Sequence, residues 1–317
     1  MRRILISDRT HPVLAEKLRE AGFEVAIEPD HDYHSLLQAV QGYSALVVRS
    51  KVIIDRAFID RAPSLRCIGR VGAGMETIDV EYAEAHGVRC LNSPEGNRDA
   101  VGEHTVGLML SLLNNIARAD AQVRQGRWLR EANRGYELGA LTVGIVGFGN
   151  MGRAVAQRLL GFGCRILAYD KYLPAGYAPH NVEEVTLDEL QSRADVLSFH
   201  VPLTPDTQHY LDARFIELMA KPFFLINTSR GAVVDTKALA DALADGKVRG
   251  AALDVLEYED MTRDGLGQMP EPLQRIINCD RTVLTPHVAG WTVESKYKLA
   301  AVLADKIIDA LNDYSRK

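Results

Sequence analysis

The sequence predicts an α/β protein with two domains, each built on a parallel sheet between helices. Its 317 residues exceed what most single hydrophobic cores contain. Short apolar, strand-like runs alternate with helix-like segments along nearly the whole chain, and this alternation is typical of parallel sheets made from βαβ units. A glycine-rich turn near the middle of the chain separates one such strand from a helix, as in doubly wound folds.

The first domain is expected within roughly the first 95 residues, a common domain size. Its predicted strands are 4–6, 24–27, 45–48, 67–71 and 88–90, and its predicted helices are 13–21, 33–40, 55–61 and 80–86. Two loops follow strand ends, where ligands usually bind in such sheets. One carries Arg49 and Ser50, and the other is Gly72-Ala73-Gly74. An arginine fork and exposed backbone N–H groups both suit an anion, although a solvated arginine and a plain turn are the alternatives.

A turn-rich linker at residues 92–97 leads into a helix predicted at 100–117, which Asp99 is expected to cap. Residues 125–138 carry Trp128, two glycines and many charges without clear periodicity. We expect this stretch to run over the surface and onto a partner subunit.

The stretch at 141–170 carries a nucleotide-binding motif. A buried strand is predicted at 142–146, followed by Gly147, Gly149 and Gly152 in G-x-G-x-x-G spacing and a helix at 153–162. These glycines permit a tight turn, a close approach to a pyrophosphate and close helix packing, and the helix N-terminus favours the diphosphate. Asp170 ends the next strand, where its carboxylate suits an adenosine ribose and favours NAD over NADP, although Lys171 softens that preference. A glycine-rich turn in another α/β protein is the alternative.

The alternation of strand-like and helix-like segments continues after residue 170. Further strands are predicted at 194–199, 223–227, 248–253 and 282–285, helices at 237–245 and 293–314, and a loop at 261–272.

Three ionisable residues follow strand ends of the second domain: Arg230, Glu259 and His287. Carboxyl ends of parallel strands share one edge of a sheet, so these side chains are expected to converge. Imidazole suits the transfer of a hydroxyl proton, a neighbouring carboxylate orients it, and arginine binds a substrate carboxylate. The alternatives are a turn histidine, a surface cation and part of the acidic run 257–260.

Two further residues bear on this set. His200, at the end of another strand, is the rival base, but its loop is expected to lie along the cofactor. Asp254 is expected to accept a hydrogen bond from the nicotinamide carboxamide or ribose.

Composition excludes several classes of protein. A net charge of −5 argues against nucleic acid as a partner, and no apolar run is long enough for a membrane span or a signal peptide. The four cysteines lie far apart, without metal-ligand or disulfide spacing. We therefore expect a cytoplasmic protein without a metal site.

The chain resembles the D-isomer-specific 2-hydroxyacid dehydrogenase family over nearly its full length. The resemblance is carried by Val48-Arg-Ser50, Gly72-Ala-Gly74, 92–103, 146–152, His200-Val-Pro-Leu-Thr204, 227–231, Ala252-Leu-Asp254 and Thr285-Pro-His287. It implies two Rossmann-like doubly wound domains, with an NAD-binding domain at 98–285 inserted into a flavodoxin-like substrate domain formed by 1–97 and 286–317. It also implies an active site in the cleft and a homodimer through the cofactor domains.

The same resemblance assigns site residues. The family's catalytic arginine, glutamate and histidine fall on Arg230, Glu259 and His287, whereas Glu257 lies at the wrong spacing from Asp254. The predicted cofactor contacts are Gly147, Gly149, Asn150, Met151, Gly152, Asp170, Val201, Pro202, Thr207, Thr228, Ser229, Asp254 and Gly290. The predicted substrate contacts are Arg49, Ser50, Ala73 and Gly74.

Within the family, the first domain most resembles phosphoglycerate dehydrogenases, which makes the conversion of 3-phosphoglycerate to 3-phosphohydroxypyruvate the expected reaction. Trp291 departs from their pattern, and the segment Val288-Ala-Gly-Trp291 partly resembles erythronate-4-phosphate dehydrogenase. Because the sequence ends at Lys317, we expect the C-terminal serine-binding domain of some phosphoglycerate dehydrogenases to be missing. The alternatives are another D-2-hydroxyacid or 2-oxoacid, including glyoxylate and hydroxypyruvate, or a non-catalytic, dinucleotide-sensing protein like the C-terminal-binding-protein corepressors. Formate dehydrogenase is disfavoured because that family carries Gln where Glu259 stands.

Overall fold

The chain folds into two compact units. The computed structural model describes residues 2–260, 265–267 and 269–313. Unit 1 runs to Arg98 and resumes at Trp291, and unit 2 comprises Asp99–Asp260 and Gly265–Gly290. Unit 2 is thus inserted into unit 1, and the predicted α/β class is confirmed.

Unit 1 is built on a parallel sheet. Its strands are β1 (Arg3–Ile6), β2 (Glu24–Ile27), β3 (Ala45–Val48), β4 (Cys67–Arg70) and β5 (Arg89–Asn92). They form a five-stranded sheet in the order β2-β1-β3-β4-β5 with parallel pairing throughout. This is the strand order of flavodoxin-like folds, so the predicted fold of this unit is confirmed.

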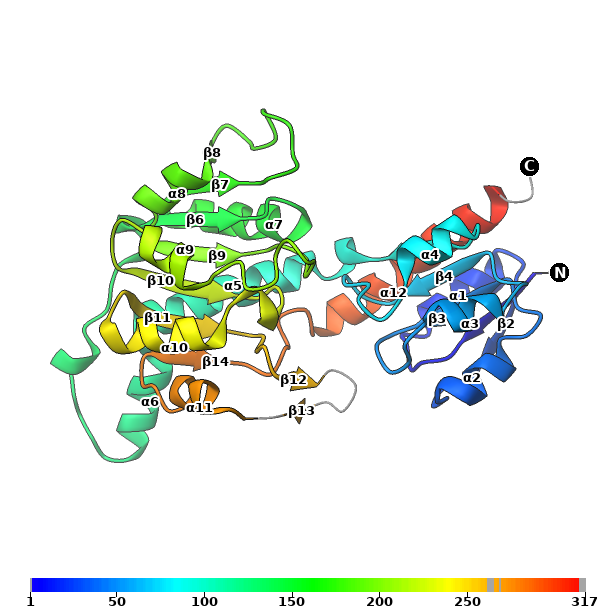
Figure 1. Cartoon of the computed structure of the whole chain (residues 1–317), viewed down its shortest axis with the longest axis horizontal. Coiled ribbons are helices and arrows are strands. Elements are labelled where there is room, and N and C mark those ends of the chain that lie inside the picture. Colours follow the sequence, from blue (N-terminus) through cyan, green and yellow to red (C-terminus); the bar gives the residue numbers. More distant parts are fainter. Residues whose placement is uncertain (1, 261–264, 268, 314–317) are drawn as a thin grey trace. The chain divides into compact units, whose positions relative to one another are not determined.

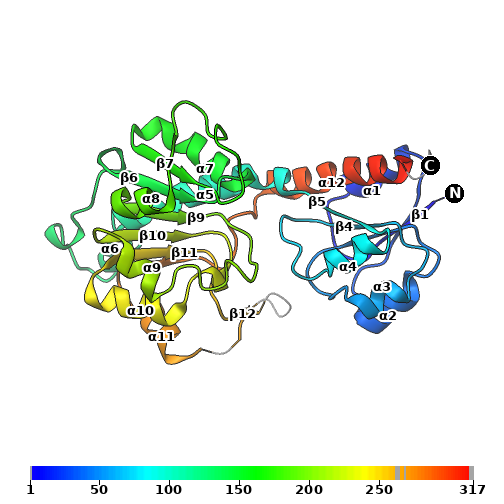
Figure 2. The ribbon, with the colours of Figure 1, turned by 45° about the horizontal axis from the view of Figure 1, so that its top comes forward.

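Helices cover both faces of this sheet. They are α1 (Val13–Glu20), α2 (Tyr33–Ala39), α3 (Arg56–Asp60), α4 (Val80–Ala85), the short 3-10 turn η1 (Pro94–Gly96) and α12 (Val293–Asp313). Helix α12 comes from the far end of the chain and lies beside α1 (Figure 2). Its Leu303 and Ile307 pack on β4, where a Cβ on Gly69 would lie 2.9 Å from Ile307 Cδ1. The two chain ends therefore share one core.

Unit 2 contains a larger parallel sheet (Figure 1). Its strands are β6 (Thr142–Val146), β7 (Arg165–Tyr169), β8 (Glu183–Glu184), β9 (Val196–Phe199), β10 (Phe223–Asn227), β11 (Val248–Leu253) and β14 (Thr282–Leu284). The order is β14-β11-β10-β9-β6-β7-β8, and every pairing is parallel. The order reverses at β6, and ligands of doubly wound sheets bind beyond the strand ends at such a switch point. A separate antiparallel ribbon joins β12 (Glu259–Asp260) to β13 (Gly265–Leu266).

The helices of unit 2 include several that the sequence analysis missed. They are α5 (Arg98–Leu113), α6 (Ile116–Arg124), η2 (Glu131–Asn133), η3 (Leu138–Ala140), α7 (Asn150–Leu159), η4 (Leu160–Phe162), α8 (Leu187–Arg193), α9 (Ala213–Leu218), η5 (Gly231–Val233), α10 (Thr236–Asp245) and α11 (Glu271–Ile277). The single helix predicted at 100–117 is wrong, because Asn115 adopts a left-handed φ of 55° that ends α5 and starts α6.

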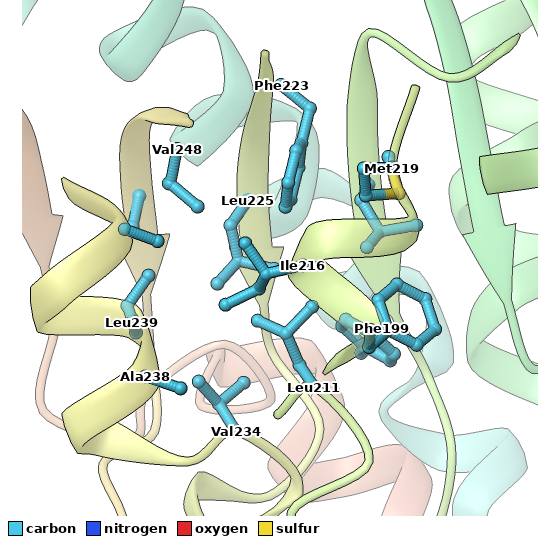
Figure 3. Packing of buried hydrophobic residues seen from close by; sticks show 14 of the residues in the cluster. Phe199, Leu211, Ile216, Met219, Phe223, Leu225, Val234, Ala238, Leu239 and Val248 are labelled. Carbon is cyan, nitrogen blue, oxygen red and sulfur yellow. The ribbon is translucent and has the colours of Figure 1, made fainter. Parts of the chain in front are cut away.

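Each face of the unit 2 sheet carries its own hydrophobic cluster. Side chains alternate along a strand, so in β10 Leu225 enters one cluster while Phe224 and Ile226 enter the other. Figure 3 shows the first cluster, in which Leu225 meets Ile216 of α9 and Leu239 of α10. The burial of these residues determines where each strand ends, and thereby where the loops of the site begin.

Two predicted segments fall partly outside the described residues. Of the loop predicted at 261–272, residues 261–264 and 268 are not described, and α11 begins at Glu271. The predicted end of the last helix, residue 314, is also not described. Among the described helices, none combines the length and the apolar character that a membrane crossing requires.

Candidate active site

The predicted glycine turn follows β6 in unit 2. Gly147 has a φ of +90°, and a Cβ there would lie 2.7 Å from the His200 carbonyl oxygen. A Cβ on Gly152 would lie 2.2 Å from the Gly147 carbonyl oxygen, whereas a Cβ on Gly149 would meet nothing within 4 Å. Gly147 and Gly152 therefore allow close packing within the turn, while the space beside Gly149 is open, as a bound pyrophosphate requires.

Helix α7 begins directly after this turn. Its N-cap is Gly149, and no side chain in the described residues caps it. The N–H groups of its first turn, at Asn150, Met151 and Gly152, thus face outward at the positive end of a 10-residue helix. Such an end suits a diphosphate.

Asp170 lies beside the same turn. Its Oδ2 accepts the Phe148 N–H at 2.8 Å, and its Oδ1 accepts the N–H groups of Tyr172 and Leu173 at 3.0 and 3.2 Å. A carboxylate offers about four lone pairs, so it retains capacity for a ribose hydroxyl. The turn, the helix end and this carboxylate together fit the adenosine side of a dinucleotide.

The loop after β9 contains the rival base, His200. Its Nε2 lies 2.8 Å from Ser198 Oγ, and its Nδ1 is buried without a hydrogen-bond partner in the described part of the chain. Burial lowers the pKa of His200 to about 3, so the ring stays neutral and is a poor acceptor of a catalytic proton near neutral pH.

The same loop carries three predicted cofactor contacts. Thr207 is buried, and its Oγ1 donates to the Pro202 carbonyl at 2.6 Å and accepts the Thr204 N–H at 2.8 Å. Thr207 thus braces the loop that presents Val201 and Pro202.

The loop after β10 presents Arg230. Asn227, which is fully buried, accepts the Ser229 N–H at 3.0 Å and the Ser229 hydroxyl at 2.7 Å, and it donates to the Arg230 carbonyl at 2.9 Å. The Arg230 guanidinium donates to the Ser229 carbonyl at 2.7 Å. Thr228 Oγ1 lies 3.0 Å from Thr105 Oγ1 of α5. This loop is therefore fixed from its own strand and from α5.

Gly231 joins this loop to the next one. A Cβ at Gly231 would lie 2.0 Å from the Leu256 carbonyl carbon and 2.4 Å from the Glu257 nitrogen. Only glycine permits this contact, which holds the Arg230 loop against the backbone that leads to Glu259.

Asp254, after β11, is 1% exposed and braces the neighbouring loop. Its Oδ1 accepts the Thr285 hydroxyl at 2.6 Å and the Val288 N–H at 2.9 Å, while its Oδ2 accepts the Ala289 N–H at 2.8 Å. Burial raises the pKa of Asp254, but hydrogen bonds from His104, Thr285 and the backbone outweigh it and hold the pKa below its usual value. The charged carboxylate thus fixes the segment around His287.

His287 meets Glu259 as the sequence predicts. His287 Nδ1 lies 3.1 and 3.2 Å from the two Glu259 carboxylate oxygens. The His287 N–H donates to the Asp254 carbonyl at 2.7 Å, and its φ of 53° is left-handed. Because an ionised carboxylate only accepts, Nδ1 carries the proton and Nε2 keeps its lone pair when the ring is neutral. The His287 side chain is 32% exposed, so its ring remains accessible.

Glu257 has different partners. Its Oε1 lies 2.6 Å from His209 Nε2, and its Oε2 accepts the Thr236 N–H at 3.1 Å and the Thr236 hydroxyl. Glu257 therefore holds the start of α10, and Glu259 is the carboxylate beside His287.

Unit 1 contains the predicted substrate contacts. The Arg49 N–H donates to Asp8 Oδ2 at 2.7 Å, and the Arg49 guanidinium lies 5.2 Å from the centre of the Trp291 ring. Arg49 and Ser50 follow β3, and Ala73 and Gly74 follow β4.

The last residue of β5 and the residue that follows it hold the second of these loops. Asn92 Nδ2 donates to the Ala73 carbonyl at 2.6 Å, and the Ser93 N–H donates to the Gly72 carbonyl at 2.9 Å. These two hydrogen bonds fix the loop that carries Ala73 and Gly74.

Several supporting residues escaped the sequence analysis. Thr105, His104 and Asn92 hold site loops through partners that are distant in the sequence, whereas Asn227 holds its own loop through Ser229 and Arg230. No simple motif marks Thr105 or His104, whereas Asn92 and Asn227 lie within segments that resemble the family. Within the described residues, no group of three or more His, Cys, Asp or Glu side chains is arranged to hold a metal.

Comparisons with known proteins agree with this geometry. A sequence profile of the D-isomer specific 2-hydroxyacid dehydrogenase NAD binding domain matches residues 106–289. The D-3-phosphoglycerate dehydrogenase of Methanocaldococcus jannaschii is 36% identical over 309 residues, which cover 97% of this chain and 57% of that protein. The hydroxypyruvate reductase of Thermotoga maritima is 36% identical over 289 residues, which cover 91% and 92% of the two chains. This chain thus spans little more than half of the first relative's length.

A solved structure shows the same fold. The D-lactate dehydrogenase of Aquifex aeolicus, complexed with NAD and lactic acid, matches with a TM-score of 0.82 at 26% identity. The match covers 99% of this chain and 95% of that one.

The doubly wound order of unit 2, with its glycine turn and the acid at 170, is that of a dinucleotide-binding protein. The chain belongs to the D-isomer specific 2-hydroxyacid dehydrogenase family, a class of NAD-dependent oxidoreductases. The predicted family and the predicted dinucleotide, NAD, are confirmed.

Proposed function

We propose that this protein is an NAD-dependent dehydrogenase that interconverts a D-2-hydroxy acid and its 2-oxo acid. The observation that carries the proposal is the contact of His287 Nδ1 with both Glu259 oxygens, at 3.1 and 3.2 Å, on loops that follow strands of the dinucleotide-binding unit. NAD, when bound, accepts or supplies the hydride.

The residues of the chain then handle the proton and the charge. His287 Nε2 takes the proton of the substrate hydroxyl during oxidation and returns it during reduction. Glu259 holds the ring in the required tautomer and stabilises the imidazolium. Arg230 binds the substrate carboxylate and stabilises negative charge on the carbonyl oxygen.

We propose 3-phosphoglycerate and 3-phosphohydroxypyruvate as the first substrate pair to test. Arg9, Arg49 and Lys51 gather after β1 and β3 of unit 1, where Arg9 and Lys51 bind Asp30 at 3.1 and 2.9 Å. This group contains three cations and two carboxylates, which are Asp8 and Asp30. The excess of positive charge favours an acid with additional negative charge. The Methanocaldococcus jannaschii relative carries the phosphoglycerate name, but the Thermotoga maritima relative is equally identical and is called a hydroxypyruvate reductase. Hydroxypyruvate is therefore the second candidate.

A panel of 2-oxo acids with NADH tests the proposal. It should include 3-phosphohydroxypyruvate, hydroxypyruvate, glyoxylate and the oxo acid of erythronate 4-phosphate. We expect turnover of at least one acid, and we expect His287→Ala to lower kcat by at least about a hundredfold while NADH fluorescence titration shows unchanged binding.

Two outcomes would oppose this proposal. Full activity of His287→Ala would remove His287 from the reaction. Binding of NADH by the wild-type protein without turnover of any acid would favour the dinucleotide-sensing alternative.

We also propose that the protein is a cytoplasmic homodimer formed through its NAD-binding domains. Light scattering should then give a mass of twice the 35.0 kDa chain. A monomer mass at micromolar concentration would oppose it.

A further inference from the structure

Two cations lie close to Asp170, the carboxylate that suits the adenosine ribose. Lys171 follows it directly, and Lys171 Nζ lies 3.0 Å from Asp206 Oδ2. Asp206 belongs to the loop after β9 and also accepts from the Tyr172 hydroxyl at 3.4 Å. The hydrogen bond between the pair raises the pKa of Lys171 and lowers the pKa of Asp206. Both side chains are more than half exposed.

The second cation, Arg153, is also engaged by the chain. Arg153 Nη1 donates to the Tyr177 carbonyl at 2.8 Å, and its guanidinium lies 5.0 Å from the centre of the Phe148 ring. Phe148 is the residue whose N–H binds Asp170. Both cations around the Asp170 turn are thus directed at acceptors of the protein itself.

This arrangement bears on the choice of dinucleotide. A 2′-phosphate adds close to two negative charges beside the ribose that Asp170 would bind. A lysine adjacent to that aspartate would normally offset the repulsion. Here Asp206 forms an ion pair with this lysine, so a second carboxylate lies beside the residue that follows Asp170.

We propose that Asp206 is a specificity residue that excludes 2′-phosphorylated dinucleotides by holding Lys171 in an ion pair. The inference rests on the dinucleotide site of unit 2 and on no particular substrate acid. A binding experiment can therefore fail while the dehydrogenase proposal stands, and the reverse also holds.

The test is Asp206→Asn, with dissociation constants for NADH and NADPH measured separately by nicotinamide fluorescence. An exposed ion pair has a modest energy, so we expect NADPH to bind about three- to tenfold more tightly than to the wild-type protein. NADH binding should change by less than about twofold, and the NADPH gain should shrink at about 0.5 M salt because exposed charges are screened.

Asp120→Asn is the matched control. Asp120 forms an equally exposed pair with Arg124 at 2.7 Å on α6, and its replacement should leave both dissociation constants unchanged. Circular dichroism should show that both variants keep the fold.

Asp206 acts in two ways, because it holds Lys171 in an ion pair and also carries a negative charge of its own. A double variant separates these two effects. In Asp206→Asn combined with Lys171→Met, the NADPH gain should largely disappear because the released cation is gone. A gain retained in the double variant would overturn the role of the ion pair. Equal changes for NADH and NADPH, or no change for NADPH, would overturn the assignment of Asp206 altogether.

Discussion

Glu257 and Glu259 are two positions apart and have different environments. Glu259 contacts His287 Nδ1 through both carboxylate oxygens, whereas Glu257 binds Thr236 and His209 at the start of α10. The sequence distinguished them only by their spacing from Asp254. In the structure Glu259 begins strand β12 of the β12–β13 ribbon, whereas Glu257 precedes that strand and contacts the start of α10.

This contrast predicts separate effects of the two amide replacements. Glu259→Gln keeps the side-chain size but removes the charge that stabilises the imidazolium, so kcat should fall on the order of a hundredfold. The melting temperature should barely change, because the residue is partly exposed and lies on a two-residue ribbon.

Glu257→Gln serves as the matched variant. It weakens the charged contacts with Thr236 and His209, so it should cost stability, on the order of 1 kcal/mol, and leave kcat within a few-fold. Steady-state kinetics and thermal melting of both proteins check the pair. If Glu257→Gln lowered kcat more than Glu259→Gln did, the assignment of Glu259 would be wrong.

The loops that follow strands β10, β11 and β14 contact one another. Gly231, after β10, touches the backbone of Leu256 and Glu257, after β11, and Asp254 on that same segment binds Thr285 and Val288, after β14. Arg230, Glu259 and His287 therefore lie on loops that contact one another, as the preorganisation of the proposed site requires.

Gly231→Ala is expected to disrupt the contact between the loops that follow β10 and β11. Its Cβ would lie 2.0 Å from the Leu256 carbonyl carbon, so the two loops must separate, at a cost of about 1–3 kcal/mol, and activity should fall with stability.

Gly107→Ala in α5 is the matched control. A Cβ there meets nothing within 4 Å, and alanine should stabilise that exposed helix position by about 0.5–1 kcal/mol. Thermal melting measures both variants, and a similar shift in the two would contradict the packing argument.

The elements also show what the sequence could predict. Runs such as Phe223–Asn227 are buried on both faces and flanked by turns, so periodicity and length identify them. The break at Asn115 depends on one left-handed residue that no hydrophobic pattern marks. Helix α8 is short, but Thr186 and Glu189 form a capping box, and this pattern is visible in the sequence.

Within the candidate site, the proposed catalytic side chains could be named from the sequence, whereas most of the residues that hold their loops could not. Arg230, Glu259 and His287 follow strand ends, so local sequence places them. Asp254 accepts the N–H of Val288, 34 positions later, and lies 3.5 Å from His104 on helix α5. Such contacts depend on how α5 packs against the sheet, which the sequence of either segment does not encode alone.

For the whole molecule, a neutral buried histidine makes stability depend on pH. The ordinary pKa of His200 is 6.5, and burial lowers it to about 3 in the folded protein. At a pH between these two pKa values, His200 binds a proton in the unfolded chain but not in the folded chain. The free energy of unfolding therefore decreases as the pH falls. The loss approaches about 1.4 kcal/mol per pH unit within that window.

The prediction is that His200→Gln has a shallower dependence of stability on pH. Urea unfolding at about pH 7.5, 6 and 5 should show the wild type losing stability on acidification and the variant losing less, because glutamine does not titrate.

Asp254 does not interfere, since its pKa lies below its usual value and its stabilising charge is lost only at more acidic pH. His180, exposed on a loop of unit 2, supplies the control: His180→Gln should keep the wild-type slope. Equal slopes for wild type and His200→Gln would mean that the buried ring accepts a proton in the folded protein, and would restore His200 as a candidate base.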